Sequence, residues 1–208
     1  MSVGICTAAI GEHYQYFLPE WAESIDQLST EADWVTIAHD GVDDKIRRYV
    51  DQLLHPLWVR VENTASNPAV NVNAAIACTG TDWIMKLDVD DLLLPHALDG
   101  VRGTDADVLC FGFRMRGTDH PGLSWATESI LMKTGNLVAS CSPFRRWVWE
   151  HQPFQDVIYD DWLFWINAAR NGARFAGTNR IDYQYRVHDL QMTKHVDHAR
   201  AYAQIKEC

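Results

Sequence analysis

The chain of 208 residues lacks several features that mark special classes of protein. It has no block of Lys and Arg, and its formal net charge is −10, so a broad electrostatic footprint on nucleic acid or anionic membranes is not expected. No apolar run approaches the roughly 20 residues of a membrane span. No charged and apolar leader precedes the first strand-like residues. We therefore expect a soluble, cytoplasmic protein without a membrane segment.

Cysteine is scarce and follows no metal-binding pattern. The five cysteines are odd in number and match no zinc spacing. Most lie in apolar surroundings, where a free thiol behaves as a small hydrophobic group. This pattern indicates a reduced, intracellular protein. Since 47% of the residues are hydrophobic, a chain of this length can bury one sizeable core, and we expect one domain over residues 1–208.

What the first half does contain is a regular alternation of two patterns. Strand-like runs at 3–7, 34–38, 57–61 and 83–87 alternate with helix-like segments at 19–28, 46–53 and 68–77. Such an alternation predicts crossover connections and a mainly parallel sheet flanked by helices, so the expected class is α/β and Rossmann-like.

The second half is less regular. It shows a strand at 108–115, a loop-rich stretch at 116–155, a helix at 161–170, a short strand at 183–186 and a closing helix at 196–206. We expect part of the loop-rich stretch to be mobile and to face a substrate. Trp125 is its best candidate for substrate contact, since an indole stacks well on flat rings and sugars.

The most informative segment is residues 83–91, WIMKLDVDD, an apolar strand that ends in three carboxylates. Alternate residues of a strand point the same way, so Asp88 and Asp90 converge. They repel each other unless a cation lies between them, and magnesium is often held by one or two carboxylates plus substrate phosphates. Ligands of parallel sheets bind beyond the carboxyl ends of the strands, where Asp40 also falls. The alternative is a solvated turn.

Five segments occur in the order typical of one enzyme family. Residues 39–44 read HDGVDD, 71–76 NVNAAI, 87–91 LDVDD, 159–162 YDDW and 185–188 YRVH. They resemble the motifs of family 2 glycosyltransferases of the GT-A fold, with the LDVDD segment matching most closely. The chain departs from the family's usual residues at 7–11, at His39 and at Val72.

The resemblance implies a function. A sugar would pass with inversion from a nucleotide-diphosphate donor, most simply a UDP-sugar, to an acceptor hydroxyl, with Mn²⁺ or Mg²⁺ as cofactor. Residues 1–112 would form the donor half, and residues 113–208 the acceptor half and closing helix. The acceptor stays open among a sugar, a lipid-linked sugar, a protein and a modified base. The oligomeric state is open as well.

The metal site implied by the resemblance centres on Asp90. Asp88 and Asp91 would assist, and Asp88 has the alternative of holding the ribose. His188 is expected to be a further ligand or a donor to the diphosphate, with a structural role as the alternative; imidazole suits manganese. Arg186 would pair with a phosphate or cap the sheet.

The expected general base is Asp161. The neighbouring carboxylate of Asp160 favours its protonated form, which brings the proton affinity closer to that needed at neutral pH. The alternative is that Asp160 and Asp161 only cap the first turn of the helix.

The remaining expected contacts are to the nucleotide. Asp40 would accept a hydrogen bond from the base and Asn73 would contact ribose or diphosphate, while a plain turn and a local backbone cap are the respective alternatives. The other expected nucleotide-binding residues are Thr7, Ala8, Ala9 and Gly41.

Two other functions compete with sugar transfer. A nucleotidyltransferase would need a Gly-rich, basic phosphate loop, but residues 8–15 contain one Gly and no Lys or Arg. A non-catalytic module that binds metal or nucleotide would leave Asp160, Asp161 and the segment 185–188 without a role.

Overall fold

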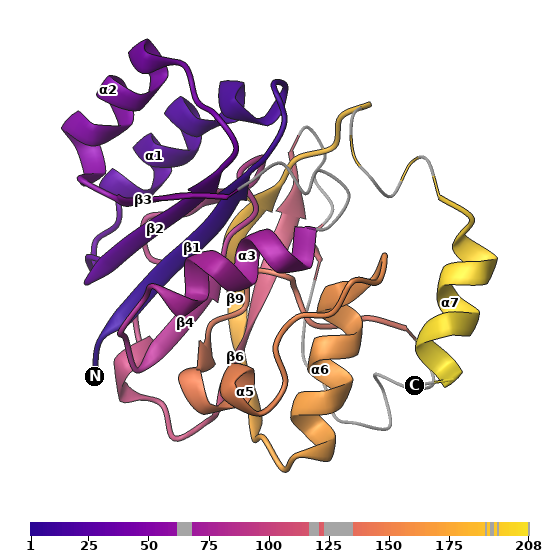
Figure 1. Cartoon of the computed structure of the whole chain (residues 1–208). Coiled ribbons are helices and arrows are strands. Elements are labelled where there is room, and N and C mark those ends of the chain that lie inside the picture. Colours follow the sequence, from indigo (N-terminus) through magenta and orange to yellow (C-terminus); the bar gives the residue numbers. More distant parts are fainter. Residues whose placement is uncertain are drawn as a thin grey trace.

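The computed structural model describes residues 1–61, 68–116, 121–122, 135–189, 191, 194 and 196–207. A nine-stranded sheet runs through them with helices on both faces (Figure 1). The strand order is β3-β2-β1-β4-β8-β6-β9-β5, and β7 pairs with β6 beside this path.

The first half has the predicted alternation. Its strands are β1 (Val3–Ala9), β2 (Trp34–His39), β3 (Leu57–Arg60) and β4 (Trp83–Lys86), and its helices are η1 (Tyr14–Phe17), α1 (Leu18–Asp26), α2 (Asp44–Leu54) and α3 (Pro68–Ala77). All three strand pairings among β1 to β4 are parallel. The carboxyl ends of these strands therefore lie at one edge of the sheet.

The second half continues the same sheet with mixed pairing. Its elements are β5 (Leu92–Leu93), η2 (Val101–Gly103), β6 (Val108–Met115), β7 (Pro121–Gly122), β8 (Phe144–Arg145), α5 (Arg146–His151), α6 (Asp160–Arg170), β9 (Phe175–Tyr185) and α7 (His198–Glu207). The short strand β8 is antiparallel to both β4 and β6, so β6 runs in the direction of β4. Strand β9 is parallel to β6. The expected mainly parallel α/β fold is confirmed, and β9 ends at the edge where β4 ends.

Each face of the sheet has its own hydrophobic core. Trp21, Ile25 and Val50 of α1 and α2 belong to the first core. The second core lies under α3, α5 and α6, on the face toward the viewer in Figure 1, and includes Trp162 and Trp165. Helices on both faces explain why β1, β2 and β4 read as nearly continuous apolar runs.

The sequence prediction was incomplete between residues 116 and 185. It missed β8 and α5 inside the loop-rich stretch, and it started the last strand at 183 where β9 starts at Phe175. A two-residue strand and a six-residue helix are too short for a periodic pattern. Trp125 and most of residues 117–134 lie outside the described residues, so the expectations about them stay predictions.

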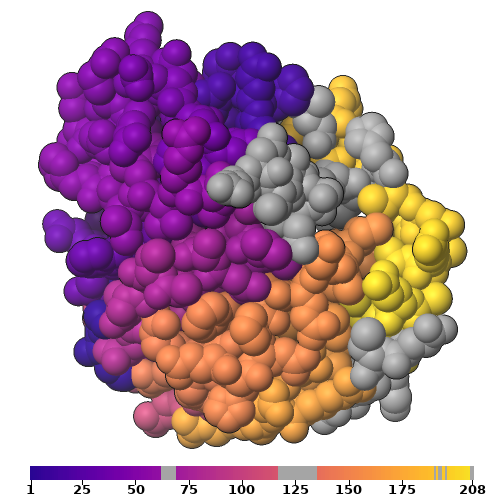
Figure 2. Space-filling view, in the orientation of Figure 1, coloured from indigo at the N-terminus to yellow at the C-terminus, as the bar shows by residue number. Residues whose placement is uncertain are grey.

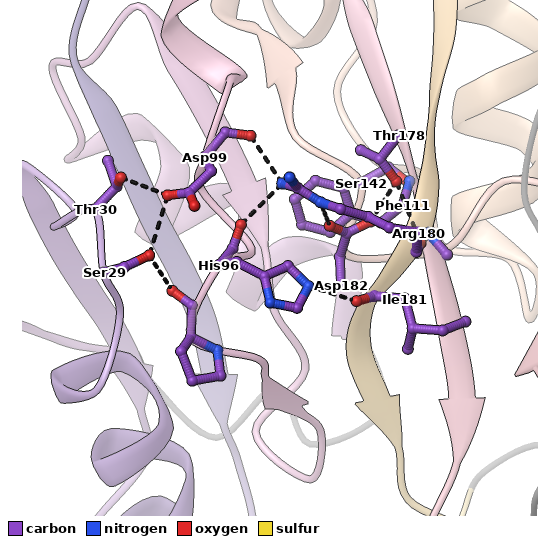
Figure 3. A network of polar contacts seen from close by, with 12 residues as sticks. Ser29, Thr30, His96, Asp99, Phe111, Ser142, Thr178, Arg180, Ile181 and Asp182 are labelled. Carbon is purple, nitrogen blue, oxygen red and sulfur yellow. Dashed lines mark hydrogen bonds and ion pairs between the residues drawn. The ribbon is translucent and has the colours of Figure 1, made fainter.

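The pairing of β6 with β9 is irregular around Gly112, where the register shifts. A Cβ added to Gly112 would overlap the carbonyl oxygen of Arg180, so the close approach of the strands requires glycine. The fully buried carboxylate of Asp182 accepts hydrogen bonds from the Gly112 backbone N–H (3.2 Å), the Arg180 Nε–H (2.7 Å) and the Thr178 hydroxyl (Figure 3). Burial of this charge is tolerated because it is paired and hydrogen-bonded.

The guanidinium of Arg180 connects this network to the segment that follows β5. Its Nη2 donates to the carbonyl oxygens of His96 and Asp99, both at 2.8 Å (Figure 3). Asp99 in turn accepts from the hydroxyl groups of Ser29 and Thr30. The irregular part of β9 is thus fixed to the chain that follows β5.

The two halves lie side by side at the surface. In Figure 2 the N-terminal segments, indigo to magenta, fill one side of the view, and the orange and yellow segments of α6 and α7 fill the other. Among the described residues no helix is both long and apolar enough to cross a membrane.

Candidate active site

A pocket of about 500 Å³ opens at the carboxyl ends of the strands. It brings together the two carboxylate groups that are 70 residues apart in the sequence, Asp88–Asp90–Asp91 after β4 and Asp160–Asp161 at the start of α6. Ala8 from the end of β1 lines it as well. The parallel pairing of β1 and β4 explains why Ala8 and Asp88–Asp90–Asp91 meet at one edge, whereas Asp160 and Asp161 reach the pocket at the start of α6, after the antiparallel β8.

Lys86 is a buried cation beside these carboxylates. Its Nζ lies 2.8 Å from Oδ1 of Asp88 and 5.8 Å from the ring centroid of Phe154. Burial alone would lower the pKa of Lys86, but the charges of Asp88, Asp160 and Asp161 outweigh it and raise the pKa. Lys86 therefore stays charged and offsets part of the negative charge of the pocket.

Asp90 meets His188 at the edge of the sheet. The turn after β4 carries Asp90, and the segment after β9 carries His188, whose Nε2 lies 2.9 Å from Oδ2 of Asp90. Phe17 packs against the imidazole at 5.0 Å between ring centroids. Nδ1 of His188 is buried and has no hydrogen-bond partner in the part of the chain that the structure describes. Burial and the charge of Asp88 raise the pKa of Asp90, so a cation here would relieve an unfavourable carboxylate.

Asp91 turns toward the protein interior. It is 1% exposed, and its Oδ1 accepts the backbone N–H of Arg186 at 2.9 Å. The Nε of Arg186 donates back to the carbonyl oxygen of Asp90 at 2.7 Å. Arg186 is the donor in both bonds, which fasten the carboxylate turn to the end of β9 and bring Asp90 and His188 together. Burial and the charges of Asp90 and Asp88 raise the pKa of Asp91 well above its usual value.

The side chain of Arg186 is engaged in other contacts besides this one. Its Nη2 lies 2.8 Å from Oε2 of Glu20, and its guanidinium stacks 4.9 Å from the ring centroid of Phe17. The described lining of the pocket does not include Arg186. Of its two expected roles, fastening the edge of the sheet is the one for which the structure provides contacts.

The residues around Asp90 suit a divalent metal in part. No group of three or more His, Cys, Asp or Glu side chains in the described part of the chain is arranged to hold a metal ion. Asp90 and His188 nevertheless offer one carboxylate and one imidazole within contact distance of each other. Such a pair fits Mn²⁺ or Mg²⁺ bound mainly through substrate phosphates and water, whereas a site closed by protein ligands does not fit.

Asp160 and Asp161 open helix α6 and face the pocket. Oδ1 of Asp161 accepts the backbone N–H of Trp162 at 2.9 Å, and its Oδ2 accepts the side-chain amide of Asn136 at 2.6 Å. Asp160 accepts the N–H of Asp161 at 2.8 Å. Burial first, and then the charge of Asp160, raises the pKa of Asp161 to about 7. The two carboxylates therefore cap the helix and line the pocket at once.

The residues at the ends of β1 and β2 that were expected to bind the nucleotide lie in different environments. Ala8 lines the pocket, and Ala9 is buried in the core beneath α1. Thr7 is 1% exposed, and its hydroxyl has no hydrogen-bond partner among the described residues. Asp40 accepts the backbone N–H of Gly11 at 3.1 Å, which joins the ends of β1 and β2. Gly41 is exposed just beyond it.

Asn73 has a different environment from the one predicted. Its Oδ1 accepts the indole N–H of Trp149 at 2.8 Å and the backbone N–H of Phe154 at 3.2 Å, and its Nδ2 donates to the carbonyl oxygen of Phe154 at 2.8 Å. The described pocket lining does not include it. Asn73 joins α3 to the segment after α5, because α3 turns this side chain away from the edge.

The pocket also contains residues that the sequence did not single out. They are Tyr14, Asn136, Ser140, Ile158 and Tyr202, together with Asn71, which was noted only as part of a motif. Tyr202 comes from α7, which lies beyond the last of the sequence motifs, so no pattern in the sequence indicated that it would line the pocket. Asn136 and Ser140 lie in the loop-rich stretch, which was expected to face a substrate but without particular residues.

Comparison with solved structures gives the fold a context. TarS 1-349 of S. aureus, solved in complex with UDP-GlcNAc, is similar with a TM-score of 0.76 and 15% identity over 95% of this chain and 62% of that chain. The mannosyltransferase PcManGT from Pyrobaculum calidifontis, solved with GDP-Man and Mn²⁺, has a TM-score of 0.68 and 17% identity over 90% of this chain and 57% of that chain.

These similarities establish the GT-A-like fold and nothing finer, because the sequence identities are low. The chain spans only 37% of the S. aureus TarS chain in a further similar structure. No protein-family model matches the sequence, and no curated protein matches it.

Proposed function

We propose that the protein is an inverting glycosyltransferase that transfers a sugar from a nucleotide-diphosphate donor, most simply a UDP-sugar, to an acceptor hydroxyl. The observation that carries this proposal is that Asp88, Asp90, Asp160 and Asp161 line the same pocket. One carboxylate group suits a metal-bound diphosphate, and the other suits a base on the opposite side of the reacting carbon. Structural similarity to proteins solved with UDP-GlcNAc and with GDP-Man and Mn²⁺ supports it.

Asp90 and His188 would hold the proposed metal, and Asp88 would assist. When bound, a divalent cation supplies Lewis-acid stabilisation of the diphosphate leaving group. Arg186 holds this turn by donating hydrogen bonds to the Asp91 carboxylate and the Asp90 carbonyl oxygen. Lys86 keeps Asp88 oriented, because their charged groups lie 2.8 Å apart.

The proposed base is Asp161. As the acceptor oxygen forms its bond to the anomeric carbon, its O–H bond breaks and the proton passes to the carboxylate of Asp161. The bond from that carbon to the diphosphate oxygen breaks on the other side, and the nucleoside diphosphate leaves with the electron pair. Attack opposite to the leaving group inverts the configuration. Asn136 orients the base through its hydrogen bond of 2.6 Å.

Two measurements test this function. In thermal shift, Mn²⁺ and UDP together should stabilise the protein by more than the sum of their separate effects, because each completes the binding site of the other. A hydrolysis screen across nucleotide sugars should then identify the donor by the nucleoside diphosphate it releases. Stabilisation by Ca²⁺ alone, unchanged by nucleotide, would instead support a non-catalytic module.

A further inference from the structure

Three aromatic side chains form one wall of the pocket beside the proposed base. This aromatic wall consists of Tyr159, Trp162 and Tyr202, all of which line the pocket. The ring of Tyr202 meets those of Tyr159 and Trp162 edge to face, with centroid distances of 5.3 and 5.0 Å. Trp162 is 1% exposed, whereas 42% of Tyr202 is exposed. Tyr202 is therefore the member of the wall that offers the largest free surface.

Helix α7 supplies this exposed ring to the site. It packs beside α6 at the surface (Figure 2), and it buries Ala201 and Ile205 on either side of Tyr202 in the sequence. Nδ1 of His198, at its start, lies 2.5 Å from the hydroxyl oxygen of Tyr159. The helix is thus anchored by an apolar face and by one polar contact. The position of Tyr202 in the pocket follows from that anchoring.

The polar lining next to the wall is poor in positive charge. Lys86 is the one cationic side chain among the described residues that line the pocket, and Asp88 already pairs with it at 2.8 Å. Asp160 and Asp161 lie on the same helix as Trp162, so a phosphate bound against the wall would meet two carboxylates. Asn136 and Ser140 provide uncharged hydrogen-bonding groups.

We propose that the acceptor is a neutral sugar whose apolar ring face stacks on Tyr202 while one of its hydroxyls reaches Asp161. A sugar ring combines an apolar face with hydroxyl donors, and it therefore matches an aromatic ring flanked by carboxylates and amides. An acceptor that carries phosphate near the reacting hydroxyl is disfavoured by the same carboxylates. This assignment rests on the proposed function, since Asp161 is placed there as the base.

Ligand binding to the unmodified protein provides the first test. Saturation-transfer NMR in the presence of Mn²⁺ and UDP would compare neutral methyl hexosides and N-acetylhexosaminides with hexose 6-phosphates. We expect contact with at least one neutral glycoside and none with the phosphates. A UDP-dependent thermal shift without any neutral glycoside contact, or with equal contact by the phosphates, would overturn the acceptor assignment alone. Absence of any UDP effect would overturn the proposed function and this assignment with it.

Kinetics of variants provide the second test. Tyr202→Ala should raise the acceptor KM about five- to tenfold through loss of the stacking surface, while the donor KM serves as the internal reference. Tyr202→Phe keeps the ring and should recover most of that loss. Tyr16→Ala is the matched control, because Tyr16 is 64% exposed and outside the described pocket lining. An unchanged acceptor KM in Tyr202→Ala would overturn the assignment.

Discussion

The two carboxylate groups of the pocket are chemically alike but are held in different ways. After β4, Asp88 pairs with Lys86 at the end of the same strand, whereas Asp90 contacts His188 and Asp91 accepts the backbone N–H of Arg186, both from the segment that follows β9. At the start of α6, Asp160 and Asp161 bind N–H groups of their own helix. Asp161 accepts the side-chain amide of Asn136 as well. Asp90 and Asp91 are thus held by the segment after β9, whereas Asp160 and Asp161 are held mainly by the first turn of their own helix.

This difference separates the roles that the residues are suited to. Carboxylates fixed from two elements of the fold keep their positions when a charged ligand arrives, as a metal–diphosphate site requires. A carboxylate at a helix start, with its pKa raised to about 7 by burial and by Asp160, is suited to exchange a proton near neutral pH. Residue type alone does not distinguish these roles; the partners do.

The largest effect that would test this comparison is expected for Asp161→Asn. Loss of the base should lower the turnover number about a hundred- to ten-thousandfold, because asparagine cannot accept the proton. The substitution keeps an oxygen that can accept the N–H of Trp162, so the variant should stay folded and bind UDP as the unmodified protein does. Steady-state kinetics and thermal shift on the same preparation measure both. If Asp161→Asn instead unfolds and shows no loss of turnover separate from unfolding, Asp161 only caps the helix and is not the base.

The next effect is expected for Asp90→Asn. Loss of the carboxylate that faces His188 should weaken the Mn²⁺-dependent binding of UDP by about ten- to a hundredfold and lower transfer with it. Isothermal titration of UDP at fixed Mn²⁺ measures the change. Retained Mn²⁺-dependent binding would remove Asp90 from the metal site. It would also remove the proposed distinction between the two carboxylate groups.

The pH dependence of turnover should distinguish the groups without any substitution. Since Asp161 must be ionised to act as a base and its pKa is raised to about 7, turnover should rise about tenfold between pH 6 and pH 8 and then level off. The stability of the fold should change in the opposite direction. Because the pKa of Asp161 is higher in the folded than in the unfolded protein, the free energy of unfolding should fall as the pH rises from about 4 to about 7.

A comparison of melting curves checks the stability part of this prediction. The unmodified protein should lose stability relative to Asp161→Asn as the pH rises through that range. A flat difference between the two proteins would show that Asp161 titrates normally in the fold. The rise in turnover would then belong to another group.

The smallest effect is expected for Asp91→Asn. Its remaining side-chain oxygen can still accept the N–H of Arg186, so UDP binding with Mn²⁺ should change less than about threefold. Asp91→Ala is the matched variant: it leaves that N–H without its partner and should cost about 1–3 kcal/mol of stability in urea unfolding. A large loss of UDP binding in Asp91→Asn alone would make Asp91 a direct metal ligand, equivalent to Asp90.

The sequence predicted the parts of the molecule that are periodic or that depend on strand direction. The alternation of the first half placed Asp40 and residues 88–91 at one edge, and a shared edge follows from parallel strands alone. It could not reveal that Arg186 binds Asp91, since these residues are 95 positions apart and meet beside the pairing of β5 with β9.

The contacts of Asn73 and Tyr202 escaped prediction for a similar reason. Helical periodicity places a residue on a face of its helix, but the direction of that face depends on how the helix packs. Asn73 faces the segment after α5. Tyr202 belongs to the last helix, whose anchoring on α6 involves aromatic contacts that no local pattern indicates.

The irregular pairing beside Gly112 bears on how such a site can vary between proteins. Val108 pairs with Phe175 and Met115 with Tyr185, so β9 advances ten residues while β6 advances seven. Three extra residues are thus absorbed within the strand, where the buried Asp182 and Arg180 fix them, and His188 still reaches Asp90. An irregular pairing of this kind allows a strand to gain or lose residues in its middle, while the side chains at its end keep their positions in the pocket.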